Sequence, residues 1–254
     1  MKGVVLAGGS GSRLGHLTKI TNKHLLPVGK YPMIYYPISK LVAAGITEIM
    51  VVTGCEHIGS IVGYLGSGHE FNCDITYKVQ DKAGGIAEAL YLAEDFAAYS
   101  DVCVILGDNI FSSSLESLVS TFNEEKQSGL CKAMITLYGL DGSAAYKHRF
   151  GVAFLEKNGF EISSIVEKPT MEKLEEMQHM RSGVVTGIYF YDHSVFEKIR
   201  MIEYSARGEK EITDVNNLYL AENRLLGCPI EGKWTDAGTH ESLLRANELM
   251  ESVQ

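Results

Sequence analysis

The sequence predicts an α/β fold with a Rossmann-like, mostly parallel central sheet, helices on both faces of that sheet and a mixed-sheet elaboration. Through the first half of the 254 residues, short apolar segments alternate with amphipathic helical segments, which is typical of parallel βαβ units. Segments such as Val102–Leu106 are apolar at every position, as in a strand buried on both faces. After about residue 130, strand-like segments follow one another without intervening helices.

The first half is expected to alternate between strand and helix from its first residues. A glycine, Gly45, follows the first predicted helix and is a typical residue just beyond a helix end. The predicted strands are Lys2–Leu6, Glu48–Thr53, Ile75–Val79 and Val102–Leu106, and the predicted helices are Pro37–Ala44, Ile58–Leu65, Ile86–Ala97 and Leu115–Gln127.

The second half is expected to lie against the first within a single domain, residues 1–254, because no Pro-, Gly- or Ser-rich linker divides the chain. Turns are predicted at Asp141-Gly142 and at Asn158-Gly159, and the second pair favours a hairpin. The predicted strands are Ala133–Tyr138, Val152–Leu155, Ile162–Val166 and Val184–Tyr191, and the predicted helices are Ser194–Arg200, Asp214–Asn223 and His240–Met250.

Composition excludes several classes of protein. Lys and Arg total 23 and Asp and Glu total 32, so the net charge of −9 disfavours nucleic acid as a partner. We find no apolar run of the roughly 18–20 residues that span a membrane, and the apolar stretch at the N-terminus is too short for a signal peptide. The five cysteines form no CxxC pair, so we expect reduced thiols, no zinc site and a cytoplasmic location.

A glycine-rich loop follows the first predicted strand, in the segment AGGSGSRL at positions 7–14. Glycines at the carboxyl end of a parallel strand let backbone N–H groups approach a phosphate. A dinucleotide-binding loop would need Gly or Ala at Leu14 and an acidic residue at Thr53, which disfavours a dehydrogenase. Gly29-Lys30-Tyr31 does not fit a Walker A loop either. The cations Arg13 and Lys23 indicate an anionic ligand.

These motifs together resemble the sugar-1-phosphate nucleotidylyltransferases, and the likeness covers essentially the whole chain. The signature consists of GGSGSRL at positions 8–14 and KHLLPVGKYPMIYYPI at positions 23–38. Further motifs recur in the order found in that family: Gln80, Gly107-Asp108-Asn109, Glu167-Lys168-Pro169, Thr186-Gly187, Gly208–Asp214 and Trp234–Thr239.

The resemblance is closest to glucose-1-phosphate thymidylyltransferases. It implies transfer of a thymidylyl group from dTTP to glucose 1-phosphate, which gives dTDP-glucose and pyrophosphate for deoxysugars such as rhamnose. It implies that Arg13 and Lys23 hold the triphosphate, that Arg13 stabilises the departing pyrophosphate, and that Asp108 and Asp236 hold Mg²⁺. Such hard oxygen ligands suit that ion, and the chemistry requires positioning and charge stabilisation. It also implies a homo-oligomer, either a dimer or a tetramer.

The resemblance also assigns substrate-binding residues. Residues of about 1–130 are expected to bind the nucleotide, and in this part Gln80 and the Gly85 backbone are expected to contact the pyrimidine base. Residues of about 131–254 are expected to bind the sugar phosphate. Trp234 is assigned to the site wall. The implied nucleotide-binding residues are Leu6, Gly8, Gly9, Gly11, Ser12, Arg13, Lys23, Gln80, Gly85 and Asp108, and the implied sugar-phosphate-binding residues are Gly151, Glu167, Lys168, Val185, Tyr189 and Arg207.

Departures from the family pattern leave alternatives open. Ser12, His24, Ala83 and Glu88 stand where the family commonly has threonine, glutamine, proline and glutamine. A UTP- or CTP-dependent sugar-1-phosphate nucleotidylyltransferase is therefore an alternative, whereas Gln80 disfavours guanine. A non-catalytic regulatory homologue is a second alternative. Longer family members continue into a helical extension that helps to build an effector site, so we expect inhibition by dTDP-rhamnose to be competitive with dTTP.

Overall fold

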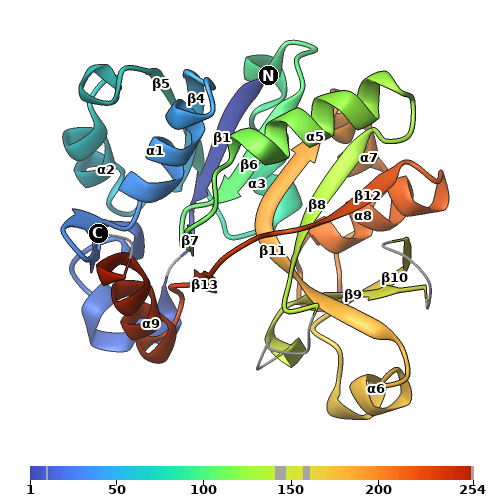
Figure 1. Cartoon of the computed structure of the whole chain (residues 1–254). Coiled ribbons are helices and arrows are strands. Elements are labelled where there is room, and N and C mark those ends of the chain that lie inside the picture. Colours follow the sequence, from blue (N-terminus) through green and yellow to red (C-terminus); the bar gives the residue numbers. More distant parts are fainter. Residues whose placement is uncertain (10, 141–146, 157–160, 253–254) are drawn as a thin grey trace.

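The computed structural model describes residues 1–9, 11–140, 147–156 and 161–252. Within this part of the chain, nine strands join in one twisted sheet with helices on both of its faces (Figure 1). The strand order is β10-β9-β11-β6-β1-β4-β5, and β8 pairs with β11 and β12. The strands are β1 (Lys2–Ala7), β4 (Glu48–Gly54), β5 (Asp74–Gln80), β6 (Val102–Leu106), β8 (Ala133–Tyr138), β9 (Gly151–Leu155), β10 (Ile162–Glu167), β11 (Arg181–Tyr191) and β12 (Leu225–Pro229).

The strands β6, β1, β4 and β5 form a parallel block that ends at the edge strand β5. Val4 of β1 lies opposite Met50 on one side and Val104 on the other. The chain passes from β1 to β4 and β5 and then returns to place β6 on the other edge of β1. The strand order therefore reverses between β1 and β6, and open α/β sheets bind ligands beyond the carboxyl ends of the strands at such a point.

Strand β11 joins the second half of the chain to this parallel block. Its residues 188–191 pair with β6 in antiparallel register, and its residues 181–184 pair with β9. The other edge of β11 pairs with β8, which is in turn parallel to β12. The sheet is therefore mixed in its second half, as the sequence predicts, and it is continuous with the first half.

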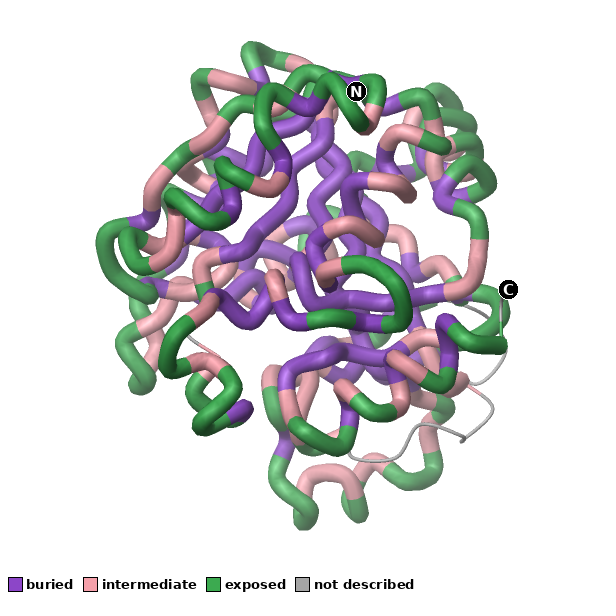
Figure 2. Tube along the Cα trace, turned by 90° about the vertical axis from the view of Figure 1, so that its left-hand side faces the viewer, coloured by how far each residue is buried: buried purple, intermediate pink, exposed green. Residues whose placement is uncertain are grey.

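Apolar side chains pack in two layers, one on each face of the sheet, so the strands lie in the interior (Figure 2). In one layer Phe122 stacks on Phe190 of β11 at a ring-centroid distance of 5.7 Å, and in the other Tyr219 stacks on Tyr191 at 5.8 Å. The helices of the first layer are α1 (Tyr35–Ala43), α2 (Ile58–Leu65) and α5 (Glu116–Gln127), and those of the second are α3 (Ile86–Tyr91), α4 (Glu94–Ala97), α7 (Val195–Met201) and α8 (Ile212–Ala221).

A third apolar cluster brings the last helix, α9 (His240–Glu251), beside the segment that follows the glycine-rich loop. Thr239 caps α9 and exchanges hydrogen bonds with Ser242. The remaining elements are β2 (Pro27–Val28), β3 (Tyr31–Pro32), β7 (Asn109–Phe111), β13 (Trp234–Asp236), α6 (Met171–Glu176) and the 3-10 helices η1 (Ser12–Thr18), η2 (Lys23–Leu25), η3 (His69–Phe71) and η4 (Lys147–Arg149).

The prediction of one helix over residues 86–97 is wrong, because the segment forms the two helices α3 and α4. The Ala93 N–H donates to the Leu90 carbonyl only three residues back, so the chain tightens and the first helix ends. Leu90, Ala93 and Ala97 are all buried in the same cluster, and their apolar spacing therefore continues across the break.

Smaller differences concern short strands. The pair β2–β3 and the strands β7 and β12 are additional to the predicted strands, and β11 begins three residues before the predicted Val184. The predicted turns at Asp141-Gly142 and Asn158-Gly159 lie outside the described residues, although β9 and β10 are antiparallel. Within the described ranges, none of the helices has the length and apolar character needed to cross a membrane.

Candidate active site

The glycine-rich loop lies directly on the side chain of Lys23. Gly11 has φ +67°, a left-handed conformation that favours glycine, and a Cβ there would lie 2.9 Å from the Lys23 Cβ. A Cβ on Gly9 would lie 3.2 Å from the Lys23 Cε. Ser12, the first residue of η1, is exposed. The loop therefore needs glycine where it crosses the stem of the lysine, and it leaves the ammonium group at the carboxyl end of β1.

Lys23 and Asp108 form a buried ion pair between this loop and the end of β6. Lys23 Nζ lies 2.5 Å from Asp108 Oδ2, and the two residues are 9% and 8% exposed. Burial raises the pKa of Asp108. The charge of Lys23 and the hydrogen bonds from Lys23 and Asn109 lower it by more than burial raises it, and the resulting pKa is about 2. Asp108 is therefore an anion at neutral pH.

Arg13 and Asp236 complete a group of charges around Gly238. A Cβ on Gly238 would lie 2.9 Å from Asp236 Oδ2, 3.2 Å from Arg13 Nη2 and 3.6 Å from Asp108 Oδ2. The Ala237 N–H donates to the Asp108 carbonyl at 2.8 Å, which ties the end of β13 to the end of β6. The four residues predicted to be catalytic therefore meet at one place, although they come from three distant segments of the chain.

The two aspartates suit a divalent cation. Burial raises the pKa of Asp236, and the charge of Asp108 raises it further, against the lowering effects of Arg149 and Arg13. Two carboxylates whose charges disfavour each other attract a cation. Within the described residues, no group of three or more His, Cys, Asp and Glu side chains gathers in a metal-binding arrangement. A hard ion such as Mg²⁺ fits this donor set, because it binds through one or two carboxylates together with substrate phosphates.

Asn109 connects the aspartates to the wall of the neighbouring cavity, a role that the sequence analysis did not assign. Its Oδ1 accepts hydrogen bonds from the Gly187 N–H at 2.8 Å and from Trp234 Nε1 at 2.7 Å, and its Nδ2 donates to Asp108 Oδ1 at 3.1 Å. The sequence offers one indication of this role, since Asn109 follows Asp108 directly in the motif Gly107-Asp108-Asn109. Asn109 thus orients Asp108, and Trp234 takes its predicted place in the site wall.

A cavity of about 270 Å³ opens on one side of the charged group, at the carboxyl ends of β1, β4 and β5. Gly8, Gly9 and Gln80 contribute to its lining, and Gln80 is only 8% exposed. Gly85, the residue just before α3, is not among the described residues that line this cavity. It has φ +99°, and a Cβ there would lie 2.4 Å from the Lys210 carbonyl oxygen. Leu6 is buried in β1 beneath the loop.

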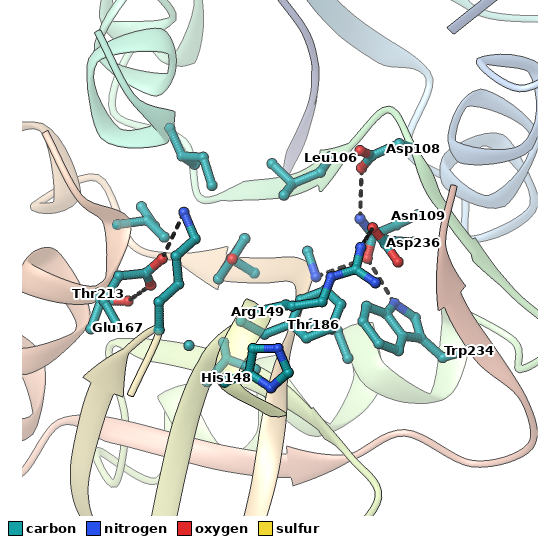
Figure 3. Close-up of a pocket in the computed structure, with 18 of the residues that line it drawn as sticks. Leu106, Asp108, Asn109, His148, Arg149, Glu167, Thr186, Thr213, Trp234 and Asp236 are labelled. Carbon is teal, nitrogen blue, oxygen red and sulfur yellow. Dashed lines mark hydrogen bonds and ion pairs between the residues drawn. The ribbon is translucent and has the colours of Figure 1, made fainter. Parts of the chain in front are cut away.

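A larger cavity of about 610 Å³ lies on the other side of the charged group (Figure 3). Glu167 Oε2 accepts a hydrogen bond from Thr213 Oγ1 at 2.7 Å, and Lys168 Nζ lies 3.7 Å from Glu167 Oε1. Burial, followed by the charge of Glu167, raises the pKa of Tyr189, so its hydroxyl keeps its proton. Five of the six predicted sugar-phosphate-binding residues line this cavity: Gly151, Glu167, Lys168, Val185 and Tyr189.

Arg207, the sixth, is not among the described residues that line the cavity. Its Nη2 lies 2.7 Å from Glu211 Oε1 and 3.4 Å from Glu167 Oε1, so it supports the cavity wall from behind. Arg149 is a lining residue that the sequence analysis missed. Its Nη2 lies 3.7 Å from Asp236 Oδ2, and the run Lys147-His148-Arg149 could have drawn attention to it as a local group of basic residues.

Comparisons with known proteins identify the family of the chain. The profile of the nucleotidyl transferase family matches residues 2–253. A glucose-1-phosphate thymidylyltransferase of Neisseria meningitidis is 41% identical over all of this chain and 84% of its own length. One of Mycolicibacterium smegmatis is 37% identical over all of this chain and 83% of its own length.

Solved structures share the fold. A crystal structure of a Bacillus anthracis protein assigned as a glucose-1-phosphate thymidylyltransferase, in complex with a sucrose, is 50% identical, with a TM-score of 0.88 over all of this chain and 96% of that one. A UDP-glucose pyrophosphorylase bound to UDP-glucose is 22% identical, covers all of this chain and 99% of that one, and has a TM-score of 0.84, a likeness that concerns the fold alone. By its sequence over nearly its whole length, the chain belongs to the nucleotidyl transferase family.

Proposed function

We propose that this protein transfers a thymidylyl group from dTTP to α-D-glucose 1-phosphate and releases pyrophosphate. The observation that carries the proposal is the meeting of Arg13, Lys23, Asp108 and Asp236 between a cavity beside Gln80 and a larger cavity beside Glu167. Relatives at 41% and 37% identity carry the name of this activity. The product, dTDP-glucose, would enter the synthesis of dTDP-rhamnose and other deoxysugars.

The reaction needs no protein nucleophile, because a phosphate oxygen of the sugar phosphate attacks the α-phosphorus of dTTP while the bond to pyrophosphate breaks. The protein has to hold two anions in line and stabilise the leaving group. Arg13 lies beside Gly238, where a Cβ would lie 3.2 Å from Arg13 Nη2, and we assign it to the departing pyrophosphate. Lys23, under the glycine-rich loop, is assigned to the triphosphate, and Lys168 to the sugar phosphate.

We assign Mg²⁺ to Asp108 and Asp236. When bound, the ion neutralises phosphate charge and orients the α-phosphate. The low pKa of Asp108, about 2, keeps that carboxyl group ionised and available as a ligand at neutral pH. Asn109 holds the Asp108 carboxylate in place through its Nδ2.

The proposal extends to the organisation of the chain. Residues of about 1–130 would bind the nucleotide, with Gln80 and Gly85 at the base, and residues of about 131–254 would bind the sugar phosphate. Glu167 would accept hydrogen bonds from sugar hydroxyls. The five free cysteines support a cytoplasmic location. A homo-oligomer, dimer or tetramer, belongs to the same proposal, and sedimentation velocity tests it.

A pyrophosphate-release assay tests the proposed activity. Glucose 1-phosphate is supplied with dTTP, UTP, CTP or GTP in turn, with Mg²⁺ and then with a chelator. We expect release with dTTP, and none once the metal is removed. Faster release with UTP or CTP would favour the alternative transferases, and a well-folded protein without release from any mixture would favour a non-catalytic homologue.

A further inference from the structure

Glu88, a residue of α3, contacts the side chain of Gln80. Gln80 lines the cavity of about 270 Å³, and Glu88 is not among the described residues that line it. Gln80 Nε2 donates to Glu88 Oε1 at 3.3 Å. A Cβ on Gly8 would lie 3.0 Å from Gln80 Oε1, so the amide oxygen points to the cavity side, where Gly8 is a lining residue. The amide therefore has a defined direction, with its oxygen forward and its nitrogen toward Glu88.

Glu88 is itself fixed. Its Oε2 accepts a hydrogen bond from the Tyr204 hydroxyl at 2.7 Å, and this bond raises the pKa of Tyr204, so the proton belongs to the tyrosine. A Cβ on Gly84 would lie 2.1 Å from both carboxylate oxygens of Glu88. The Glu88 carboxylate therefore lies between Gln80 and Tyr204, in a space that a side chain at position 84 would fill.

A carboxylate accepts hydrogen bonds and cannot donate them. If the Gln80 amide turned over, its oxygen would face Glu88 Oε1 across the distance that Nε2 now spans, and two acceptors would repel each other. A glutamine at position 88 would not impose this direction, because its own amide can turn to offer either a donor or an acceptor. In this chain the charge at position 88 therefore fixes the direction of the Gln80 amide.

The direction of the amide matters because pyrimidines differ on this edge. Thymine and uracil present an N3–H donor beside a carbonyl acceptor, which matches an amide oxygen beside an amide N–H. Cytosine presents an N3 acceptor beside an amino donor, which matches the amide only after it has turned over. We propose that Glu88 is a specificity-determining positioning residue that locks Gln80 in the direction that accepts thymine and uracil and rejects cytosine. This inference rests on the proposed function and adds a reason for its choice of base.

The test compares specificity constants, kcat/KM, for dTTP and dCTP at saturating glucose 1-phosphate. Glu88→Gln should lower the dTTP-to-dCTP ratio by roughly 10- to 100-fold, because the turned amide no longer faces an unmatched acceptor. Gly84→Ala displaces the Glu88 carboxylate without removing its charge and should lower the ratio in the same direction. Glu94→Gln, which makes the same exchange on the neighbouring helix α4, is the matched control and should keep the ratio of the unaltered protein.

The outcomes separate this inference from the proposed function. A fall in kcat/KM for both nucleotides with an unchanged ratio in Glu88→Gln would overturn the inference, since that is what a purely structural role predicts. Absence of activity with dTTP in the unaltered protein would instead contradict the proposed function. A lowered ratio in Glu88→Gln and Gly84→Ala, but not in Glu94→Gln, is the result that the inference requires.

Discussion

Lys23 Nζ lies 2.5 Å from Asp108 Oδ2, and this ion pair joins η2, which begins at Lys23, to a residue just beyond β6, 85 residues further along the chain. Both side chains are about one-tenth exposed. A charge buried in this way depends on its partner, because loss of one member leaves the other without compensation. The pair therefore serves the fold and the site together.

The first prediction concerns the stability that this pair contributes. Lys23→Ala should lower the free energy of unfolding by about 3 kcal/mol, because Asp108 is left buried without its cation. Lys126→Ala breaks a pair of the same 2.5 Å length with Asp101, but Lys126 is 35% exposed, so that change should cost less than about 1 kcal/mol. Urea denaturation measures both. Equal losses in the two variants would contradict the structural role of the Lys23–Asp108 pair.

A second prediction separates function from stability at Asp236. Burial and the charge of Asp108 raise the pKa of Asp236, so the folded protein disfavours its ionised form. Asp236→Asn should therefore leave the free energy of unfolding of the metal-free protein equal or higher, while turnover falls by orders of magnitude. Asp108→Asn should also lose turnover. Asp95→Asn, at an exposed position of α4, is the control. Near-normal turnover in either site variant would remove that residue from the metal site.

A third prediction concerns acid stability and His24. Burial, with the charge of Lys23, lowers the pKa of His24 to about 3, against the ordinary 6.5 in the unfolded chain. Between these two pH values the unfolded state binds one more proton than the folded state, so stability falls as the pH falls through this window.

Removing the imidazole should weaken that dependence. Between pH 7.5 and pH 5, the metal-free protein should lose roughly 2 kcal/mol more unfolding free energy than His24→Gln does. Urea midpoints at the two pH values measure the difference, and the same exchange at the exposed His69 controls for loss of an imidazole. Parallel pH profiles for the protein and His24→Gln would show that His24 does not set the acid limit.

A fourth prediction assigns Arg13 to the leaving group. Arg13→Ala should lower kcat far more than it raises KM for glucose 1-phosphate, because the charge acts where pyrophosphate departs. Lys19→Ala, an exposed cation just after η1, should have little effect. Steady-state kinetics with both substrates varied distinguish the assignments. Unchanged kcat with a raised KM for the sugar phosphate would place Arg13 on the other substrate.

The sequence predicts best those helices and strands in which the spacing of apolar residues is regular from the first residue to the last. The segments Ile58–Leu65 and Val102–Leu106 are the observed α2 and β6 at the predicted bounds. Helix α2 ends before Gly66, which has φ +56°, and β6 is buried at four of its five residues. The break between α3 and α4 escaped prediction because buried alanines continue across it. Two-residue strands such as β2 are set by their partners and leave no periodic pattern.

Much of the candidate site could be predicted, because the glycines, the cations and the aspartate at a strand end can each be recognised from the residues next to them in the sequence. The meeting of Asp108 with Asp236 was predicted only through the family resemblance, since 128 residues separate them in the sequence. The roles of Asn109 and Arg149 depend on side chains that meet across β7, β13 and η4. Such roles follow from distances in the folded chain and not from local spacing.

The most direct test of the central claim is the identification of the sugar nucleotide formed in competition. The protein receives equal concentrations of dTTP, UTP, CTP and GTP with glucose 1-phosphate, galactose 1-phosphate and mannose 1-phosphate, in the presence of Mg²⁺, and mass spectrometry with chromatographic separation of isomers identifies the products. The account predicts dTDP-glucose as the principal product, and none in a matched reaction with Asp108→Asn. A different nucleotide or sugar in the principal product, or no product from folded protein, would contradict it.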